Sequence, residues 1–257
     1  MPRHKHFVDA YFGGGSVLLA CDPMDPNRST DGKGISEVAN DISGTLTNFW
    51  RVLQGPCFPE FQRTLSVTPF SRNEWNKARY HIKTGDPIQD AVAFFVRCRQ
   101  SLSGRQDSFS SIVRTRTRRS MNDNVSGWLS AVEGLPEVHA RLQRVLVENR
   151  PALDIIRSED ANDTLFYLDP TYPSETRTSK DVYEHEMSDN DHYELLGTIT
   201  ECTGKVMISS YNIPGLPVSD TYRAKLSNWN RHDKEIHNHA SGSKKKPVMT
   251  EVLWCNF

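Results

Sequence analysis

The stretch "KHFVDAYFGGGSVLLAC", residues 5–21, decides the fold of this chain because a strand pattern runs directly into a glycine turn. Residues 5–12 are rich in apolar and aromatic side chains, which predicts a short buried strand. Glycines at 13–15 let the backbone approach a ligand where a Cβ would not fit, and a following helix directs N–H groups at an anion. The stretch therefore predicts the nucleotide-binding start of an α/β sheet. Alone it also fits a plain tight turn, and without the G-x-G-x-x-G spacing it disfavours a dinucleotide-dependent dehydrogenase.

Strand and helix patterns alternate toward both ends of the chain, which is typical of an α/β sheet. Residues 35–43 predict a second strand that ends in Asn40 and Asp41, and residues 44–55 have apolar side chains at helical spacing. A short strand and a helix are expected within 144–156, and a helix capped by Ser188 further on. Further strands are expected at 163–172, 204–212, 229–241 and 247–257.

Residues 56–145 have a different pattern, with helices and no run of alternating strands. The spacing predicts a Ser-capped helix within 68–82, a helix at 90–102 and two helices within 125–145 that are broken at 134–136. The polar stretch 103–126 between them is rich in Arg and Ser. We expect one discontinuous sheet domain, 1–55 and 146–257, with a mostly helical insertion at 56–145.

The composition excludes several classes of protein. The formal net charge of −1 gives no overall support for nucleic-acid binding, and the mean hydropathy of −0.59 and short apolar runs predict no membrane span. The N-terminus has no apolar leader segment. Five scattered cysteines without a C-x-x-C pair favour a reducing, cytoplasmic setting, and the histidines of "HDKEIHNH" have no nearby cysteine, so no metal is expected.

Two clusters of positive charge stand out locally. "VRTRTRR" (113–119) holds four arginines, and "GSKKKP" (242–247) holds three consecutive lysines. Each run fits a solvated surface, and each also fits a surface that contacts phosphates.

The stretch "LDPTY" at 168–172 carries the clearest chemistry. Asp169 follows a core strand and so lies at the edge where α/β proteins bind ligands. Its carboxylate and the carbonyl of Pro170 are two hydrogen-bond acceptors beside the ring of Tyr172. Two such acceptors localise the lone pair of an aromatic amine, and the ring stabilises a nearby cationic methyl donor by roughly 0.5–2 kcal/mol. A structural loop with a capping Asp is the alternative interpretation.

A family resemblance joins these motifs. In this order, "FVDAYFGGGSV", "ANDIS", "LFYLDPTY", "HEMSDNDHYELL", "KVMISSYN" and "MTEVLWCN" resemble DNA adenine methyltransferases of the Dam-like class. The resemblance implies a Rossmann-like methyltransferase sheet that uses S-adenosylmethionine and a target-recognition insert at 56–145. It also implies methyl transfer to the N6 amine of a flipped adenine in duplex DNA. Expected partners are double-stranded DNA and a cognate restriction endonuclease, with the protein a monomer.

The motif positions carry the functional residues of that family over to this chain. The implied catalytic residues are Asp169 and Pro170, which bind the amine, and Tyr172, which stacks on the base. The implied cofactor residues, with Asp41 on the ribose and Met187 at the adenine, are Asp9, Tyr11, Phe12, Gly13, Gly15, Asp41, Leu168, Asp169 and Met187. The implied DNA contacts are Arg97, Arg99, Gln100, Arg114, Arg116, Arg118, Arg119, Lys244 and Lys245.

Two departures from the family pattern keep alternatives open. Thr171 stands where the family has a second proline, and the printed sequence lacks the Gly-Gly-Lys helix that usually precedes the first strand. These departures motivate an alternative hypothesis, a catalytically impaired DNA-binding remnant with weakened cofactor binding. A methyltransferase acting on RNA or on a protein amide is a further alternative, because related motifs serve such substrates.

Overall fold

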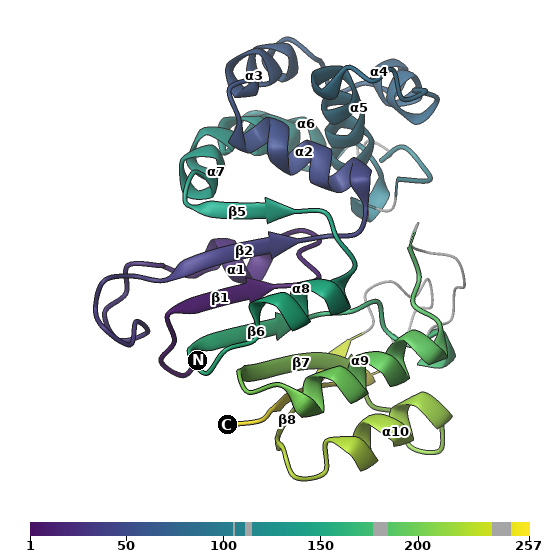
Figure 1. Cartoon of the computed structure of the whole chain (residues 1–257). Helices are drawn as coiled ribbons and strands as arrows, with labels where there is room; N and C mark the ends of the chain where they lie inside the picture. Colours follow the sequence, from purple (N-terminus) through teal and green to yellow (C-terminus); the bar gives the residue numbers. More distant parts are fainter. Residues whose placement is uncertain (105, 111–114, 177–184, 238–247) are drawn as a thin grey trace. The chain divides into compact units, whose positions relative to one another are not determined.

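The computed structural model describes residues 1–104, 106–110, 115–176, 185–237 and 248–257. Its main sheet has seven strands in the order β5-β2-β1-β6-β7-β9-β8 (Figure 1). Strands β1, β2, β6 and β7 pair in parallel, whereas β9 runs antiparallel to both β7 and β8. The strands are β1 (His6–Asp9), β2 (Ser36–Asn40), β5 (Val145–Glu148), β6 (Thr164–Leu168), β7 (Lys205–Tyr211), β8 (Asn230–His237) and β9 (Val248–Cys255). This arrangement confirms the expected Rossmann-like α/β fold.

The strand order reverses direction at β1. The chain passes from β1 to β2 on one side and later enters β6 on the other side of β1. Such a reversal opens a crevice at the carboxyl ends of the strands, where α/β proteins bind ligands. Asp9 ends β1, Asp41 follows β2 and Asp169 follows β6. The topology therefore brings three acids to one edge of the sheet.

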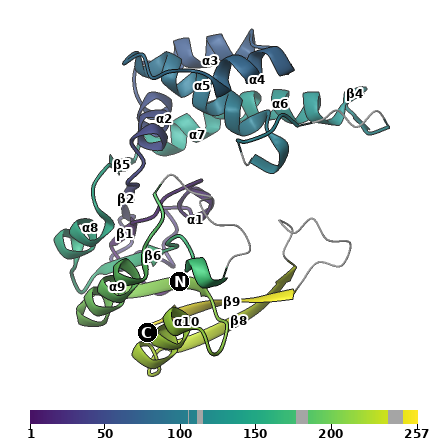
Figure 2. The ribbon, with the colours of Figure 1, turned by 90° about the vertical axis from the view of Figure 1, so that its right-hand side faces the viewer.

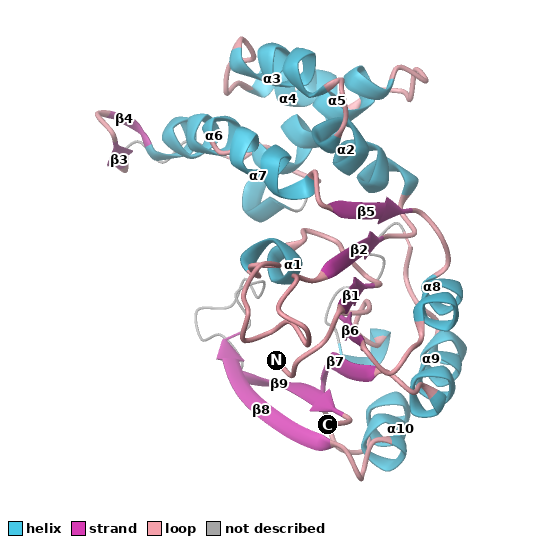
Figure 3. Cartoon of the chain, turned by 60° about the vertical axis from the view of Figure 1, so that its left-hand side comes forward, coloured by secondary structure: helices cyan, strands magenta, loops and turns pink. Residues whose placement is uncertain are grey.

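Helices cover both faces of the sheet, so its central strands are apolar almost throughout. Helices α8 (Ala152–Glu159), α9 (Asp189–Glu201) and α10 (Pro217–Lys225) lie along one face, and α1 (Ser16–Ala20) lies on the other (Figure 3). Val8, Phe166 and Ile208 are fully buried in this core. Burying a side chain of this kind contributes roughly 1.5–3 kcal/mol, so the core holds the strand ends in place.

The chain divides into two compact units. The first comprises 1–43 and 148–257, and the second comprises 44–147. The second unit is helical, and its core joins the rings of Phe49, Phe61, Phe95 and Trp128. Its helices are α2 (Gly44–Gln54), α3 (Phe58–Ser66), α4 (Arg72–Arg79), α5 (Pro87–Arg99), η1 (Leu102–Gly104), α6 (Asp123–Glu133) and α7 (Leu135–Leu142).

A small hairpin also belongs to the helical unit. It consists of β3 (Thr117–Arg118) and β4 (Met121–Asn122), which pair antiparallel and lead into α6 (Figure 2). Arg119 and Ser120 form its tip with φ angles of 56° and 61°. Residues other than glycine rarely adopt this left-handed conformation, so the tip is a strained feature of the arginine-rich stretch.

Most expected elements are confirmed, and the caps explain why. Ser71 accepts a hydrogen bond from Glu74 N at the start of α4, and Ser188 forms a capping box with Asp191 at the start of α9. The closing strand pair is confirmed as β8 and β9, while the lysine turn between them lies outside the described residues. The sequence analysis did not predict α3, α10 or the hairpin. Helix α2 is part of the second unit.

Candidate active site

The glycine loop after β1 is tight and needs glycine at its last position. Gly15 has a φ of 69°, and its N–H donates to the Phe12 carbonyl at 2.7 Å. A Cβ at Gly15 would lie 2.6 Å from the buried Phe12 ring, whereas a Cβ at Gly14 would meet no atom within 4 Å in the described part of the chain. Gly15 therefore packs so closely against the Phe12 ring that a side chain at this position would disturb the loop.

Asp41 ties this loop to the end of β2. Its Oδ2 accepts from the Gly13 N–H at 2.9 Å and its Oδ1 accepts from the Ser43 N–H at 2.8 Å. The fully buried Asn40 next to it donates to the Ala10 carbonyl at 3.1 Å. These bonds hold the first two strand ends together in a single backbone network.

Asp9 is a buried acid with an unsatisfied oxygen. Its side chain is 2% exposed, and Oδ1 has no hydrogen-bond partner among the residues that the structure describes. Burial raises the pKa of Asp9 to about 8, and the charges of Asp169 and Asp41 add to the effect. A buried carboxylate is costly unless a cation pairs with it. The site therefore favours a ligand with a positively charged group.

Asp169 lies at the end of β6 and remains accessible to solvent. Its Oδ1 accepts a hydrogen bond from Ser209 Oγ at 2.7 Å. Partial desolvation by the surrounding protein raises the pKa of Asp169, and the charge of Glu251 acts in the same direction. Hydrogen bonds from Ser209 and Tyr172 oppose this rise. With Oδ1 held by Ser209, the carboxylate can present its other oxygen to a donor.

Tyr172 is held from two sides. Its hydroxyl donates to Glu251 Oε1 at 2.6 Å, and its ring meets the Tyr211 ring edge-on with centroids 4.4 Å apart. Burial, followed by the charge of Asp169, raises the pKa of Tyr172. The phenol therefore stays protonated near neutral pH and serves as a hydrogen-bond donor.

Thr171 makes a contact that a proline could not make. The Met187 N–H donates to Thr171 Oγ1 at 3.1 Å. This bond joins the loop after β6 to the segment that enters α9. The departure from the family pattern thus replaces a rigid ring by a side-chain tether.

The first unit contains all the predicted catalytic and cofactor residues. Phe12 is 4% exposed, Leu168 is fully buried in the core, and Tyr11 and Met187 are partly buried and pack against that core. The sequence analysis did not select Ser209, Glu251 or Asn40. The polar end of "KVMISSYN" is a sequence feature that could have pointed to Ser209, but only the pairing of the strands shows which acid Ser209 contacts.

The predicted DNA contacts differ from one another in exposure and in the contacts they make within the protein. Arg99, Arg116 and Arg118 are exposed. Arg97 Nε donates to Gln106 Oε1 at 2.7 Å, and Arg119 forms an exposed two-point ion pair with Glu133. Arg114, Lys244 and Lys245 lie outside the described residues.

Gln100 requires a correction. Its side chain is fully buried, accepts from the Ser71 N–H at 3.1 Å and donates to the Pro69 carbonyl at 3.0 Å. Both ends of the amide are occupied by the protein's own backbone. Gln100 is therefore a structural residue and not a DNA contact.

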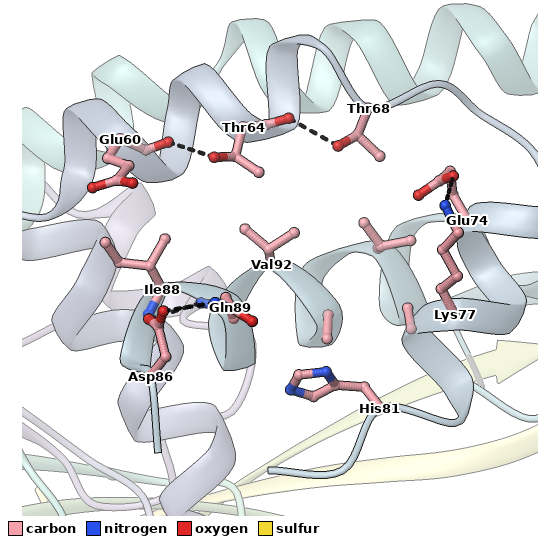
Figure 4. A pocket seen from close by; sticks show the side chains of 13 residues that line it. Glu60, Thr64, Thr68, Glu74, Lys77, His81, Asp86, Ile88, Gln89 and Val92 are labelled. Carbon is pink, nitrogen blue, oxygen red and sulfur yellow. Dashed lines mark hydrogen bonds and ion pairs between the residues drawn. The ribbon is translucent and has the colours of Figure 1, made fainter. Parts of the chain in front are cut away.

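A hollow of about 290 Å³ lies within the helical unit, between α3, α4 and α5 (Figure 4). Thr64 and Thr68 hydrogen-bond carbonyls one turn earlier, and Lys77 pairs with Glu74 at 2.7 Å. Asp86 accepts from the Ile88 N–H at the start of α5. These contacts serve the helices themselves, so the hollow has no feature that selects a ligand.

Neither a metal centre nor a membrane span is found in the described part of the chain. Within those residues no three His, Cys, Asp or Glu side chains gather to hold a metal ion. None of the described helices is both long and apolar enough to cross a membrane. All five cysteines are free thiols.

Comparison with known proteins places the chain in a family. The model of the D12 class N6 adenine-specific DNA methyltransferase family matches residues 1–240. The chain belongs to this family, whose activity is methylation of adenine in DNA. No curated protein matches the chain.

Proposed function

We propose that this protein transfers a methyl group from S-adenosylmethionine to the N6 amine of a flipped adenine in duplex DNA. The observation that carries the proposal is Asp169, an accessible carboxylate whose Oδ1 is anchored by Ser209 at 2.7 Å. It stands at the carboxyl end of β6, beside a glycine loop and in a chain of the N6 adenine-specific family. This is where an α/β protein binds ligands.

The residues of the loop fit S-adenosylmethionine. The glycines at 13–15 carry no side chain that would keep the cofactor from the loop backbone, and the orphaned Oδ1 of Asp9 suits the ammonium group of the cofactor. In this proposal Tyr11, Phe12 and Gly13 surround the methionine end and Asp41 binds the ribose. Leu168 and Met187 line the remaining wall.

The target amine would be held by two acceptors. Asp169 accepts one N–H through the oxygen that Ser209 leaves open, and the Pro170 carbonyl accepts the other. The ring of Tyr172 stacks on the base, and unstacking that base from the duplex costs a few kcal/mol. With both N–H bonds engaged, the nitrogen lone pair points away from the ring system and can attack.

S-adenosylmethionine, held by the glycine loop, Asp9 and Asp41, would supply an electrophilic methyl group to the amine held by Asp169 and Pro170, with S-adenosylhomocysteine as the leaving group. The methylated amine then gives up one proton. Asp169 can accept this proton and release it, because its carboxylate is open to solvent. The chain's own residues thus position the amine and remove its proton.

Cations of the helical unit would contact the DNA backbone. Arg99, Arg116 and Arg118 are exposed and can each neutralise a phosphate. We propose the same role for Arg97 and Arg119, and for Arg114, Lys244 and Lys245 on sequence grounds. A target-recognition role of the insert, a monomeric state, a cytoplasmic location and a restriction endonuclease partner belong to the same proposal.

The test is methylation of mixed-sequence duplex DNA with radiolabelled S-adenosylmethionine. We expect label on adenine with the wild-type protein and at least a roughly hundredfold loss with Asp169→Ala. Asp163→Ala is the matched control, because Asp163 lies just before the opposite end of β6 in an exposed pair with Lys5. Full activity of Asp169→Ala would overturn the mechanism. Absence of label with the wild type would overturn the function.

A further inference from the structure

Two carboxylates compete for the one proton of the Tyr172 hydroxyl. The hydroxyl donates to Glu251 Oε1 at 2.6 Å. Asp169 stands three residues before Tyr172 in the same loop, and the Tyr172 hydroxyl also lowers the pKa of Asp169, so the hydroxyl lies near both acids. The carboxylate that accepts the hydrogen bond from Tyr172 has one fewer acceptor site for another donor.

Strand pairing places Glu251 for this contact. Glu251 on β9 is the register partner of Tyr211 on β7, whose ring meets Tyr172 edge-on at 70°. The two neighbours therefore fix both the tilt of the Tyr172 ring and the direction of its O–H bond.

We propose that Glu251 is a positioning residue that holds Tyr172 in its stacking orientation and keeps its hydroxyl away from Asp169. Ser209 already occupies Oδ1 of Asp169. If the Tyr172 hydroxyl turned to the other oxygen, it would engage a lone pair that can otherwise face the incoming amine, and the carboxylate would be a weaker acceptor for that amine. Glu251 thereby reserves one oxygen of Asp169 for substrate. This inference rests on the proposed methyl transfer.

Removal of Glu251 is expected to act through the Tyr172 hydroxyl alone. Glu251→Ala lets that hydroxyl turn to Asp169, and we expect kcat to fall about tenfold to a hundredfold, the range of a hydrogen bond to a charged group. KM for S-adenosylmethionine should change much less, because neither Glu251 nor Tyr172 belongs to the glycine loop that is proposed to hold the cofactor. In the Tyr172→Phe background, Glu251→Ala should have no further effect.

The experiment measures kcat and KM of full-length wild type, Glu251→Ala, Tyr172→Phe and the double variant on duplex DNA. Glu235→Gln is the matched control, because Glu235 is an exposed acid on the neighbouring strand β8. Circular dichroism and thermal unfolding show that each variant is folded. Glu251→Gln, which keeps the side-chain size and an acceptor oxygen, should retain most of the activity.

A pH profile separates positioning from a merely structural role. Charged or titratable groups around Glu251 include Asp169 and Lys234, its register partner on β8, and the hydroxyls of Tyr167, Tyr172 and Tyr211. The negative charge of Glu251 raises the pKa of Asp169. Glu251→Gln should therefore move the acid limb of kcat/KM to lower pH, because Asp169 stays ionised further down.

Different failures lead to different conclusions. Unchanged kcat in Glu251→Ala, or equal losses with and without the Tyr172 hydroxyl, would overturn the inference while adenine methylation by the wild type left the proposed function standing. A wild-type protein that leaves adenine unmethylated would overturn the proposed function, and this inference with it.

Discussion

The sheet edge and the helical unit use charge in opposite ways. Three acids lie at the carboxyl ends of β1, β2 and β6. Asp41 and Asp169 each accept a hydrogen bond, whereas Oδ1 of Asp9 has no hydrogen-bond partner among the described residues. In the helical unit Arg99, Arg116 and Arg118 are exposed, and Arg119 is paired with an exposed glutamate. Charges at the edge are therefore costly and specific, whereas those of the helical unit are inexpensive and replaceable. Substitutions should differ in size accordingly.

The largest effect is expected at Asp9, as a dependence of stability on pH. Because its folded-state pKa is raised to about 8, the folded protein holds a proton that the unfolded chain releases near its ordinary value of 3.8. Stability is therefore lost as pH rises between these two values. Asp9→Asn should match the wild type near pH 4 and exceed it near pH 8 by on the order of a few kcal/mol.

Urea unfolding at both pH values measures this difference. S-adenosylmethionine should reduce the stability difference between the wild type and Asp9→Asn near pH 8, because its ammonium group compensates the buried charge of Asp9 in the wild type. An equal difference at both pH values would show that Asp9 is not held protonated.

The next effect is expected at Gly15. Gly15→Ala combines a φ of 69° with a Cβ 2.6 Å from the Phe12 ring, so it should destabilise the protein by about 1–3 kcal/mol and weaken cofactor binding. Gly14→Ala is the matched control, since the described atoms leave open space at that Cβ. Thermal unfolding and calorimetric titration with S-adenosylmethionine check both. Equal stability and equal cofactor affinity of the two variants would show that the loop does not need glycine at position 15.

A smaller effect is expected at Thr171. Thr171→Val removes the acceptor for the Met187 N–H and should cost about 0.5–1.5 kcal/mol. If this segment lines the cofactor site, KM for S-adenosylmethionine should rise severalfold while kcat changes little. Thr171→Ser keeps the hydroxyl and should behave as the wild type. A rise in KM with Thr171→Ser as well would show that the hydroxyl acceptor alone does not account for the effect.

The smallest effect is expected at the surface pair of the helical unit. Glu133→Gln frees Arg119, whose pair is exposed on both sides, so unfolding should change little. DNA binding should become tighter and more dependent on salt, because one more cation can meet a phosphate. Filter binding at two salt concentrations measures this, with Arg119→Gln as the opposite case. Unchanged salt dependence in both variants would exclude Arg119 as a phosphate contact.

The sequence predicted the fold and most residues of the candidate site because both predictions rest on local patterns. Apolar strands, a glycine run and the serines at 71 and 188 act within a few residues of themselves, so the sequence predicted strands β1 and β6, which end at Asp9 and Leu168, before the expected ends at 12 and 172. An acid that follows a core strand lies at the sheet edge in any α/β fold. Asp41 and Asp169 could thus be chosen from their positions, whereas Asp9 was chosen through the resemblance to the family.

What the sequence left open depends on pairing across long distances. Tyr172 and Glu251 are 79 positions apart, and Ser209 reaches Asp169 only because β7 lies beside β6. Gln100 resembled a polar DNA contact until packing showed both ends of its amide bonded to backbone. The sequence by itself determined which groups stand at the strand ends, since strand periodicity is local. Only the tertiary structure decided which oxygen each donor occupies, because strand register sets that geometry.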